Sequence, residues 1–163
     1  MDEDQGIESI EEGLVPAEEM RGDDLRDTHL LNGMLEEATD FIRGFAWSGT
    51  IGRRWLGLGV GGVIAVFLFE LEPTQPDVDD RLWVVVGDLP PAYLVTEDAP
   101  TARDALTGYV DEMSRWVAAA RAGAPVGDLI PVNVPPTPEN ADLLERRLVF
   151  LRDTFLRDTL LEG

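Results

Sequence analysis

The stretch from Val63 to Leu71 constrains the fold more than any other part of the sequence. It runs Val-Ile-Ala-Val-Phe-Leu-Phe-Glu-Leu, and this run of β-branched and aromatic residues predicts a strand. A strand of an antiparallel sheet with one wet face alternates apolar and polar side chains. Residues 63–69 do not alternate, and neither do residues 82–86. We therefore expect both faces of the central strands to be covered.

Three further segments predict strands around this one, over residues 53–60, 81–86 and 92–96. Gly61-Gly62 is typical of a two-residue hairpin turn, residues 73–80 predict a loop, and Leu89-Pro90-Pro91 predicts a turn. The connections are too short for parallel crossovers. The four strands are therefore expected to form a mostly antiparallel meander.

Helical periodicity flanks the strands on both sides. Apolar residues recur at steps of three and four from Asp27 to about Trp47, with Asp27 or Thr28 as the cap. Two further helices are expected to begin at Thr101 and at Thr137-Pro138, joined by a Pro-rich, extended link over residues 124–136. The predicted fold class is α+β: an N-terminal helix, a four-stranded mostly antiparallel sheet and two C-terminal helices, in a single domain over residues 25–163.

This arrangement leaves two ways to cover the sheet. The three helices can divide between its faces, or all pack on one face and leave the other to a second subunit or partner. We slightly favour some self-association, so a homodimer is among the expected partners.

The residue types that are missing exclude several chemistries. The chain has 163 residues and a formal charge of −19, with no Cys, no Lys and His29 as its one histidine. It therefore lacks thiolate nucleophiles, disulfides, Cys-ligated metals, Schiff-base lysines and the phosphate-binding lysine of a P-loop. The 32 acidic residues outnumber the 13 Arg, which argues against nucleic-acid and anionic-membrane binding.

The first 24 residues form an acidic segment. They hold ten Asp or Glu and one Arg, with few apolar side chains, and this composition predicts disorder. The acidic start is the wrong sign for a secretory signal, and the longest uncharged run, 15 residues from Trp55 to Phe69, is too short to span a bilayer. Together with the absence of Cys, this predicts a cytoplasmic protein.

Two motifs point to ligands, but each has a more ordinary explanation. Residues 57–62 (Gly-Leu-Gly-Val-Gly-Gly) match G-x-G-x-x-G, yet a strand follows them instead of the helix that a dinucleotide site requires. Five carboxylates between Glu70 and Asp80 lack the spacing and the Gly of an EF-hand. We expect no cofactor, no metal and no catalytic residues.

The charge favours a non-catalytic protein-binding module, such as an inhibitor or immunity-type protein that covers a basic surface like a nuclease site. A dense negative field steers association with a basic partner and can imitate a phosphate backbone. Trp47 and Trp55 flank a Gly-containing turn and are expected to be exposed. The predicted contact residues are therefore Glu36, Glu37, Asp40, Asp77, Asp79, Asp80, Trp47 and Trp55.

Two other functions fit the same sequence. The acidic excess, with Arg in place of every Lys, fits a salt-adapted structural or complex subunit that has no charge-specific partner. An enzyme that uses carboxylates, with or without Mg²⁺, would need at least two of them to converge in a pocket with raised pKa values.

Overall fold

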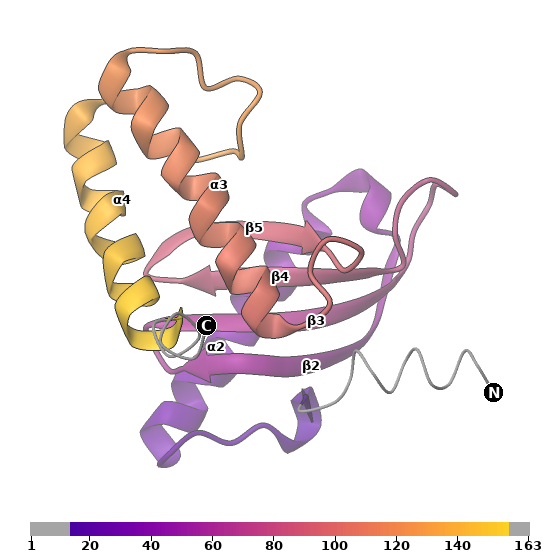
Figure 1. Ribbon diagram of the computed structural model, residues 1–163. Helices are drawn as coiled ribbons and strands as arrows, with labels where there is room; N and C mark the ends of the chain where they lie inside the picture. Colours follow the sequence, from indigo (N-terminus) through magenta and orange to yellow (C-terminus); the bar gives the residue numbers. More distant parts are fainter. Residues whose placement is uncertain (1–13, 157–163) are drawn as a thin grey trace.

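The computed structural model describes residues 14–156, which form a sheet with helices on both sides (Figure 1). The elements are β1 (Val15–Pro16), α2 (Leu25–Arg43), β2 (Thr50–Val60), β3 (Ile64–Glu72), β4 (Arg81–Gly87), β5 (Leu89–Val95), α3 (Ala102–Ala122) and α4 (Pro138–Leu151). Short 3₁₀ turns follow β1 and α2, and a π-helical turn follows α4. The α+β prediction, with one helix before the sheet and two after it, is confirmed.

The sheet has five antiparallel strands, which lie in chain order from β1 to β5. The expected count of four was therefore short by one. The additional strand, β1, is two residues long and places Val15 opposite Leu56 and Pro16 opposite Trp55. So short a strand, half of it Pro, shows no alternation that a sequence pattern could detect.

The β2–β3 hairpin closes with three residues instead of the expected two. Val60 pairs with Ile64, the Val63 amide donates to the Val60 carbonyl at 3.0 Å, and Gly62 has a φ of 79°. Gly supplies this left-handed conformation without steric cost. The G-x-G-x-x-G match thus lies in a strand and its hairpin turn, and strand β3 follows directly.

The predicted turn at Leu89-Pro90-Pro91 is wrong, because these residues begin β5. The turn itself is Asp88, with Gly87 opposite Leu89. Pro cannot donate to a ladder and is therefore found in edge strands. Strand β5 is the last of the sheet, and its pairing with β4 shifts register between Val85 and Gly87, so Pro90 and Pro91 lie at an irregular point of an edge strand.

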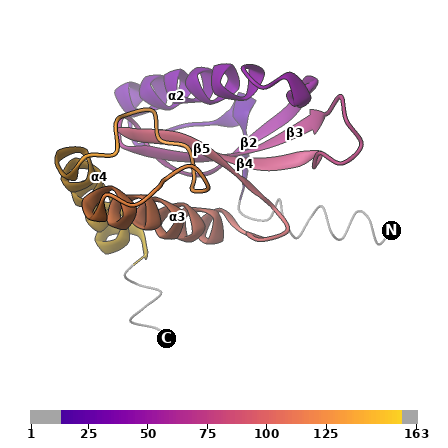
Figure 2. The same cartoon turned by 90° about the horizontal axis from the view of Figure 1, so that it is seen from above.

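Both faces of the sheet are covered (Figure 2). One face packs against α2, and the other packs against α3, which α4 flanks. Alternate residues of the strands enter opposite cores: Phe67 and Val84 pack with the α2 core, whereas Leu68 and Trp83 pack with the α3 core. The absence of alternation in β3 and β4 is thereby explained. Helices of the described part of the chain cover both sheet faces, so neither face calls for a second subunit, and self-association stays a prediction.

The helix starts follow local capping rules. The Thr101 and Thr137 hydroxyls accept the amides of Asp104 at 3.1 Å and Asn140 at 3.2 Å, as their sequence signatures predict. Helix α2 begins earlier than expected, because Asp24 is its cap and accepts the Asp27 amide at 2.7 Å.

The expected cap, Asp27, has another role. Its carboxylate accepts the amides of Gly61 at 2.6 Å and Asp23 at 2.7 Å. It therefore ties the β2–β3 turn to the start of α2.

The acidic segment predicted to be disordered covers residues 1–24, of which 1–13 lie outside the described residues. From Leu14 onward the chain packs along β2, where Ala17 and Met20 are buried in the α2 core. Within residues 14–156, none of the helices combines the length and the apolar composition needed to cross a membrane.

Candidate functional site

The acidic residues predicted to contact a partner are exposed, and they lie on two different elements. Glu36, Glu37 and Asp40 are on α2, on the side away from its buried stripe. The other three, Asp77, Asp79 and Asp80, are in the β3–β4 loop, where Asp79 and Asp80 line a shallow depression. Among the described residues, no hydrogen bond or ion pair joins the two sets.

The two tryptophans predicted to be exposed differ. Trp55 is only 6% exposed, so that prediction is wrong. It pairs with Leu68 of β3, and its ring lies in the core beneath α3, with the Arg53 guanidinium 4.9 Å from the ring centroid. Trp47 is half-buried in the 3₁₀ turn after α2, where it contacts other aromatic residues.

A cavity of about 710 Å³ lies beside strand β5. We call it the β5 groove. Four parts of the chain line it: Phe41 of α2 with Phe45 just after that helix, residues 90–95 of β5, Asp98 of the β5–α3 turn with Glu112 of α3, and residues 128–133 of the α3–α4 connection. Figure 2 shows that connection (orange) returning toward β5.

An aromatic cluster forms one wall of the β5 groove. Phe45 stacks on Trp47 with ring centroids 4.9 Å apart, and Tyr93 meets both rings edge-on at 5.4 and 5.1 Å. Phe41 adds an edge contact to Phe45 at 5.2 Å. All four rings remain partly accessible, and Tyr93 is 38% exposed. Such a cluster offers apolar contact area and ring faces that attract cations.

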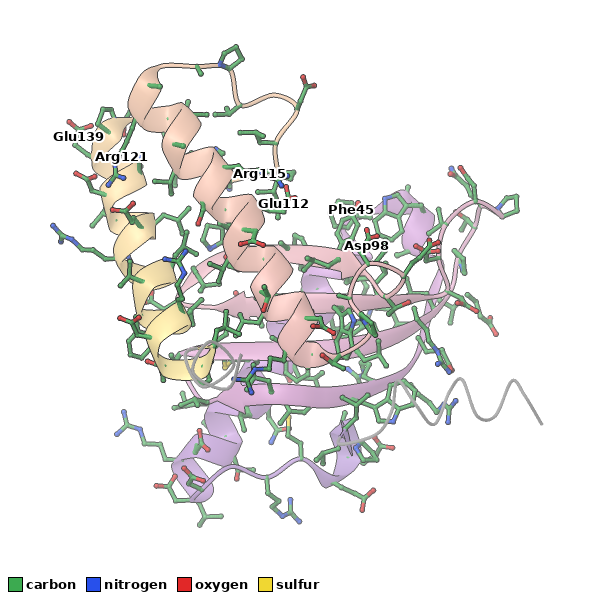
Figure 3. All side chains as sticks on the ribbon, viewed as in Figure 1. Phe45, Asp98, Glu112, Arg115, Arg121 and Glu139 are labelled. Atoms are coloured by element: carbon green, nitrogen blue, oxygen red, sulfur yellow. The ribbon has the colours of Figure 1, made fainter. Side chains whose placement is uncertain are left out.

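Three carboxylates, those of Asp98, Glu112 and Asp128, line the same groove. Glu112 pairs with Arg115 at 3.0 Å, whereas Asp98 and Asp128 have no ion pair with any residue in 14–156. None of the described lining residues is Arg or His. Figure 3 shows that Phe45, Asp98 and Glu112 come from three separate elements. The groove is therefore apolar and aromatic with negative charge, and it favours a cationic ligand.

Two hydrogen bonds, one part-buried and one buried, hold the start of the strand that lines the groove and the turn that follows it. The Tyr109 hydroxyl, on α3, donates to the Pro90 carbonyl at 2.6 Å. The Trp83 indole donates to the Ala99 carbonyl, just after β5, also at 2.6 Å. Burial raises the pKa of Tyr109 above its ordinary range, so its hydroxyl keeps the proton that it donates.

Other charged clusters hold the fold together. Glu70 of β3 pairs with Arg53 of β2 at 3.1 Å and with Arg81 of β4 at 3.7 Å, and the hydrogen bond from Arg53 is the main cause that lowers its pKa. Glu70 was one of the five clustered carboxylates in the sequence. Its two arginine partners make it a structural link across three strands.

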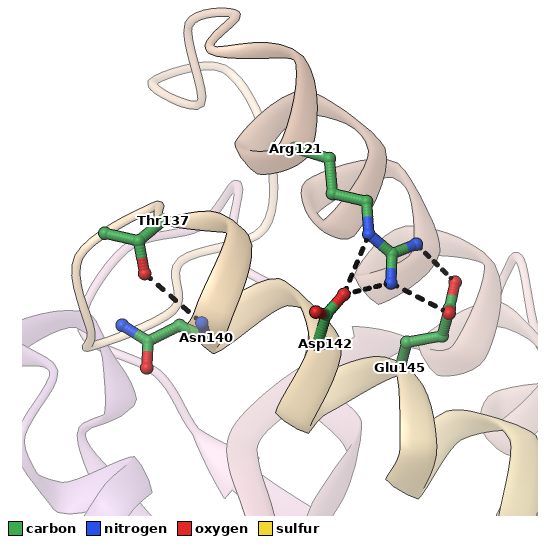
Figure 4. A network of polar contacts seen from close by, with 5 residues as sticks. All are labelled: Arg121, Thr137, Asn140, Asp142 and Glu145. Carbon is green, nitrogen blue, oxygen red and sulfur yellow. Dashed lines mark hydrogen bonds and ion pairs between the residues drawn. The ribbon is translucent and has the colours of Figure 1, made fainter.

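A second cluster joins the two C-terminal helices (Figure 4). Arg121 of α3 bonds Asp142 of α4 and donates to Glu145 at 2.7 Å, which lowers the pKa of Glu145. These exposed groups tie α4 to α3. In the part of the chain that the structure describes, no three His, Asp or Glu side chains gather as metal ligands would.

Sequence reasoning missed most of the β5 groove. None of the eight predicted contact residues lines the groove; Trp47 comes nearest, because it contacts the lining residues Phe45 and Tyr93. Phe41 and Phe45 fell within the apolar stripe predicted for the first helix and were therefore assigned to the core. The Pro-rich connection over residues 124–136 was the one sequence feature that could have indicated the groove, because an extended segment that packs across a domain can form one wall of a groove.

Comparison with known proteins adds no assignment: no family model, no curated protein and no solved structure matches this chain.

Proposed function

We propose that this protein is a non-catalytic protein-binding module whose β5 groove binds a basic segment of a partner protein. The observation that carries the proposal is the pairing of an accessible aromatic cluster with Asp98 and Asp128, two carboxylates without an ion pair among residues 14–156. An Arg or Lys side chain meets both needs, because its stem packs on rings while its cation faces carboxylates.

The remaining negative charge acts at longer range. The net charge of −19 attracts a basic partner before contact, and the exposed carboxylates of α2 and of the β3–β4 loop contribute to that field. In this proposal Glu36, Glu37 and Asp40, like Asp77, Asp79 and Asp80, mainly raise the association rate. The groove supplies the short-range contacts that slow dissociation.

The concrete form of the proposal is an inhibitor or immunity-type protein that covers a basic surface such as the active site of a nuclease. Inhibition of that kind requires only binding, which fits a chain that has one His and no Cys or Lys. The same residue usage supports a cytoplasmic location, because reducing compartments do not call for disulfides.

Selection from a library of short random peptides tests the groove directly. The purified protein is expected to enrich peptides rich in Arg or Lys with at least one apolar residue. Raising the salt concentration should weaken their binding, because dissolved ions screen the attraction between the peptides and the exposed carboxylates. Enrichment of acidic or neutral peptides would overturn the proposal.

A matched pair of variants then locates the binding. Asp98→Asn with Asp128→Asn removes two carboxylates from the groove, and Asp77→Asn with Asp79→Asn removes two from the β3–β4 loop, which does not line the groove. The groove variant should lose about tenfold or more in affinity, and the loop variant should change mainly the association rate. Equal losses in affinity would show that the groove is not the site.

A further inference from the structure

Strand β5 presents an open edge to the groove. It is the last strand of the sheet, so within residues 14–156 one side of its backbone has no neighbouring strand. Among the described residues, the backbone groups of residues 92–94 have no hydrogen bond outside the sheet. The α3–α4 connection lines the groove with residues 128–133, yet no backbone hydrogen bond joins it to β5.

We propose that the groove takes the partner's segment as an added strand, antiparallel or parallel to β5, along Ala92–Leu94. This inference rests on the function proposed above and specifies its mode. An edge strand exposes a row of N–H and C=O groups that an extended peptide can pair with. The occupant is therefore an extended, basic peptide segment of another protein.

Both ends of this edge are closed, which limits where pairing occurs. Pro90 and Pro91 have no N–H, and the Pro90 carbonyl already accepts the Tyr109 hydroxyl. At the other end, the Val95 carbonyl accepts the Asp98 amide at 3.3 Å. The added strand is consequently short, and side-chain contacts must supply much of its affinity.

The geometry of a strand also sets which side chains the groove selects. Along β5 itself, Tyr93 faces the aromatic cluster on the α2 side, whereas Ala92 and Leu94 pack on the α3 side. Side chains of an added strand alternate in the same way. One position should face the aromatic rings, and its neighbours should face the wall formed by Leu129 and Ile130.

The opposite edge of the sheet is a poorer site for the same peptide. Strand β1 covers β2 only at Trp55 and Leu56, so residues 50–54 also form an edge. A smaller cavity of about 330 Å³ lies there, but two arginines, Arg53 and Arg54, line it with a single carboxylate, Glu18. Their positive charge disfavours a basic segment, while Asp98 and Asp128 favour one at β5.

Single N-methylation of the strongest selected peptide tests the added strand. Each backbone N–H of the peptide is methylated in turn, and the affinity is measured by titration. A β-addition predicts losses of about tenfold at every second position and small changes between them, since alternate amides face β5. Hydrogen exchange at the amides of residues 92–94 that face the groove should slow when the peptide is bound.

The outcomes separate this inference from the proposed function. Binding that depends on Asp98 and Asp128 but shows no alternation, with unchanged exchange at residues 92–94, would overturn the added strand and leave the protein-binding function standing. If no enriched peptide depends on those two carboxylates, both proposals fall. Alternation combined with slower exchange supports both.

Discussion

Removing one buried hydroxyl should measure how firmly strand β5 is held. Tyr109 is fully buried in α3, and its hydroxyl donates to the Pro90 carbonyl at 2.6 Å. Tyr109→Phe keeps the ring and deletes only the donor. A hydrogen bond of this kind contributes about 1 kcal/mol net, and an acceptor left unpaired adds a desolvation penalty. Because Pro90 is only half-buried, water can reach its carbonyl in part, and we expect a loss of about 1.5 kcal/mol.

Urea denaturation followed by tryptophan fluorescence gives the free energy of unfolding at neutral pH. Tyr93→Phe is the matched control, because Tyr93 is 38% exposed and its hydroxyl bonds no group among the described residues. The control should change stability by less than about 0.5 kcal/mol. In a thermal scan the Tyr109 variant should melt about 3–6 °C lower. Equal effects from the two variants would refute a structural role for the bond.

The same residue predicts an alkaline effect. Burial raises the pKa of Tyr109, so above pH ~10 the unfolded chain loses this proton while the folded chain keeps it. The stability of the wild type must therefore fall as pH rises, by up to about 1.4 kcal/mol per pH unit from this group. Tyr109→Phe lacks that loss, so the two stability curves should cross near pH ~11. Parallel curves would contradict the reasoning.

Three further substitutions test other contacts. At pH 7, Glu70→Gln should lower the free energy of unfolding by about 1 kcal/mol. Because the lowered pKa of Glu70 stabilises the wild type only while the carboxylate is ionised, this deficit should vanish as the pH falls well below the ordinary carboxyl value of 4.5. Unfolding measured along an acid titration checks this. Thr137→Ala should cost about 1 kcal/mol through its lost cap, whereas Thr107→Ala, at mid-helix, should cost much less in urea unfolding. Asp27→Ala should destabilise by about 1–3 kcal/mol and speed hydrogen exchange at the Gly61 amide.

Local signals in the sequence predicted the elements that depend on neighbouring residues. Thr101 and Thr137 cap their helices because a side-chain oxygen reaches an amide three residues on, which any such sequence allows. The unbroken apolar run of β3 required cover on both faces, and helices provide it on both. Trp55 was misjudged because Gly49 and Gly52 before it are typical of a turn, although β2 already begins at Thr50 and carries Trp55 into the core beneath α3.

The groove could not be predicted because its walls come from distant parts of the chain. Phe45, Tyr93 and Asp128 become neighbours only once α2 and α3 lie on opposite faces and the α3–α4 connection returns to the edge of the sheet. Periodicity places a residue on one face of its own element and says nothing of which other element stands beside it. Pro90 and Pro91 illustrate this limit, since only the sheet order shows that they lie in an edge strand.

The order of elements along the chain has a consequence for synthesis on the ribosome. Helix α2 precedes strands β2–β5 in the chain, whereas α3 and α4 follow them. A nascent chain that has emerged up to Val95 can therefore assemble the sheet with one face covered, while Ile64, Val66 and Trp83 still await α3. Exposed apolar surface in such intermediates promotes aggregation. We therefore expect the nascent chain to be most prone to aggregation in the interval before α3 emerges.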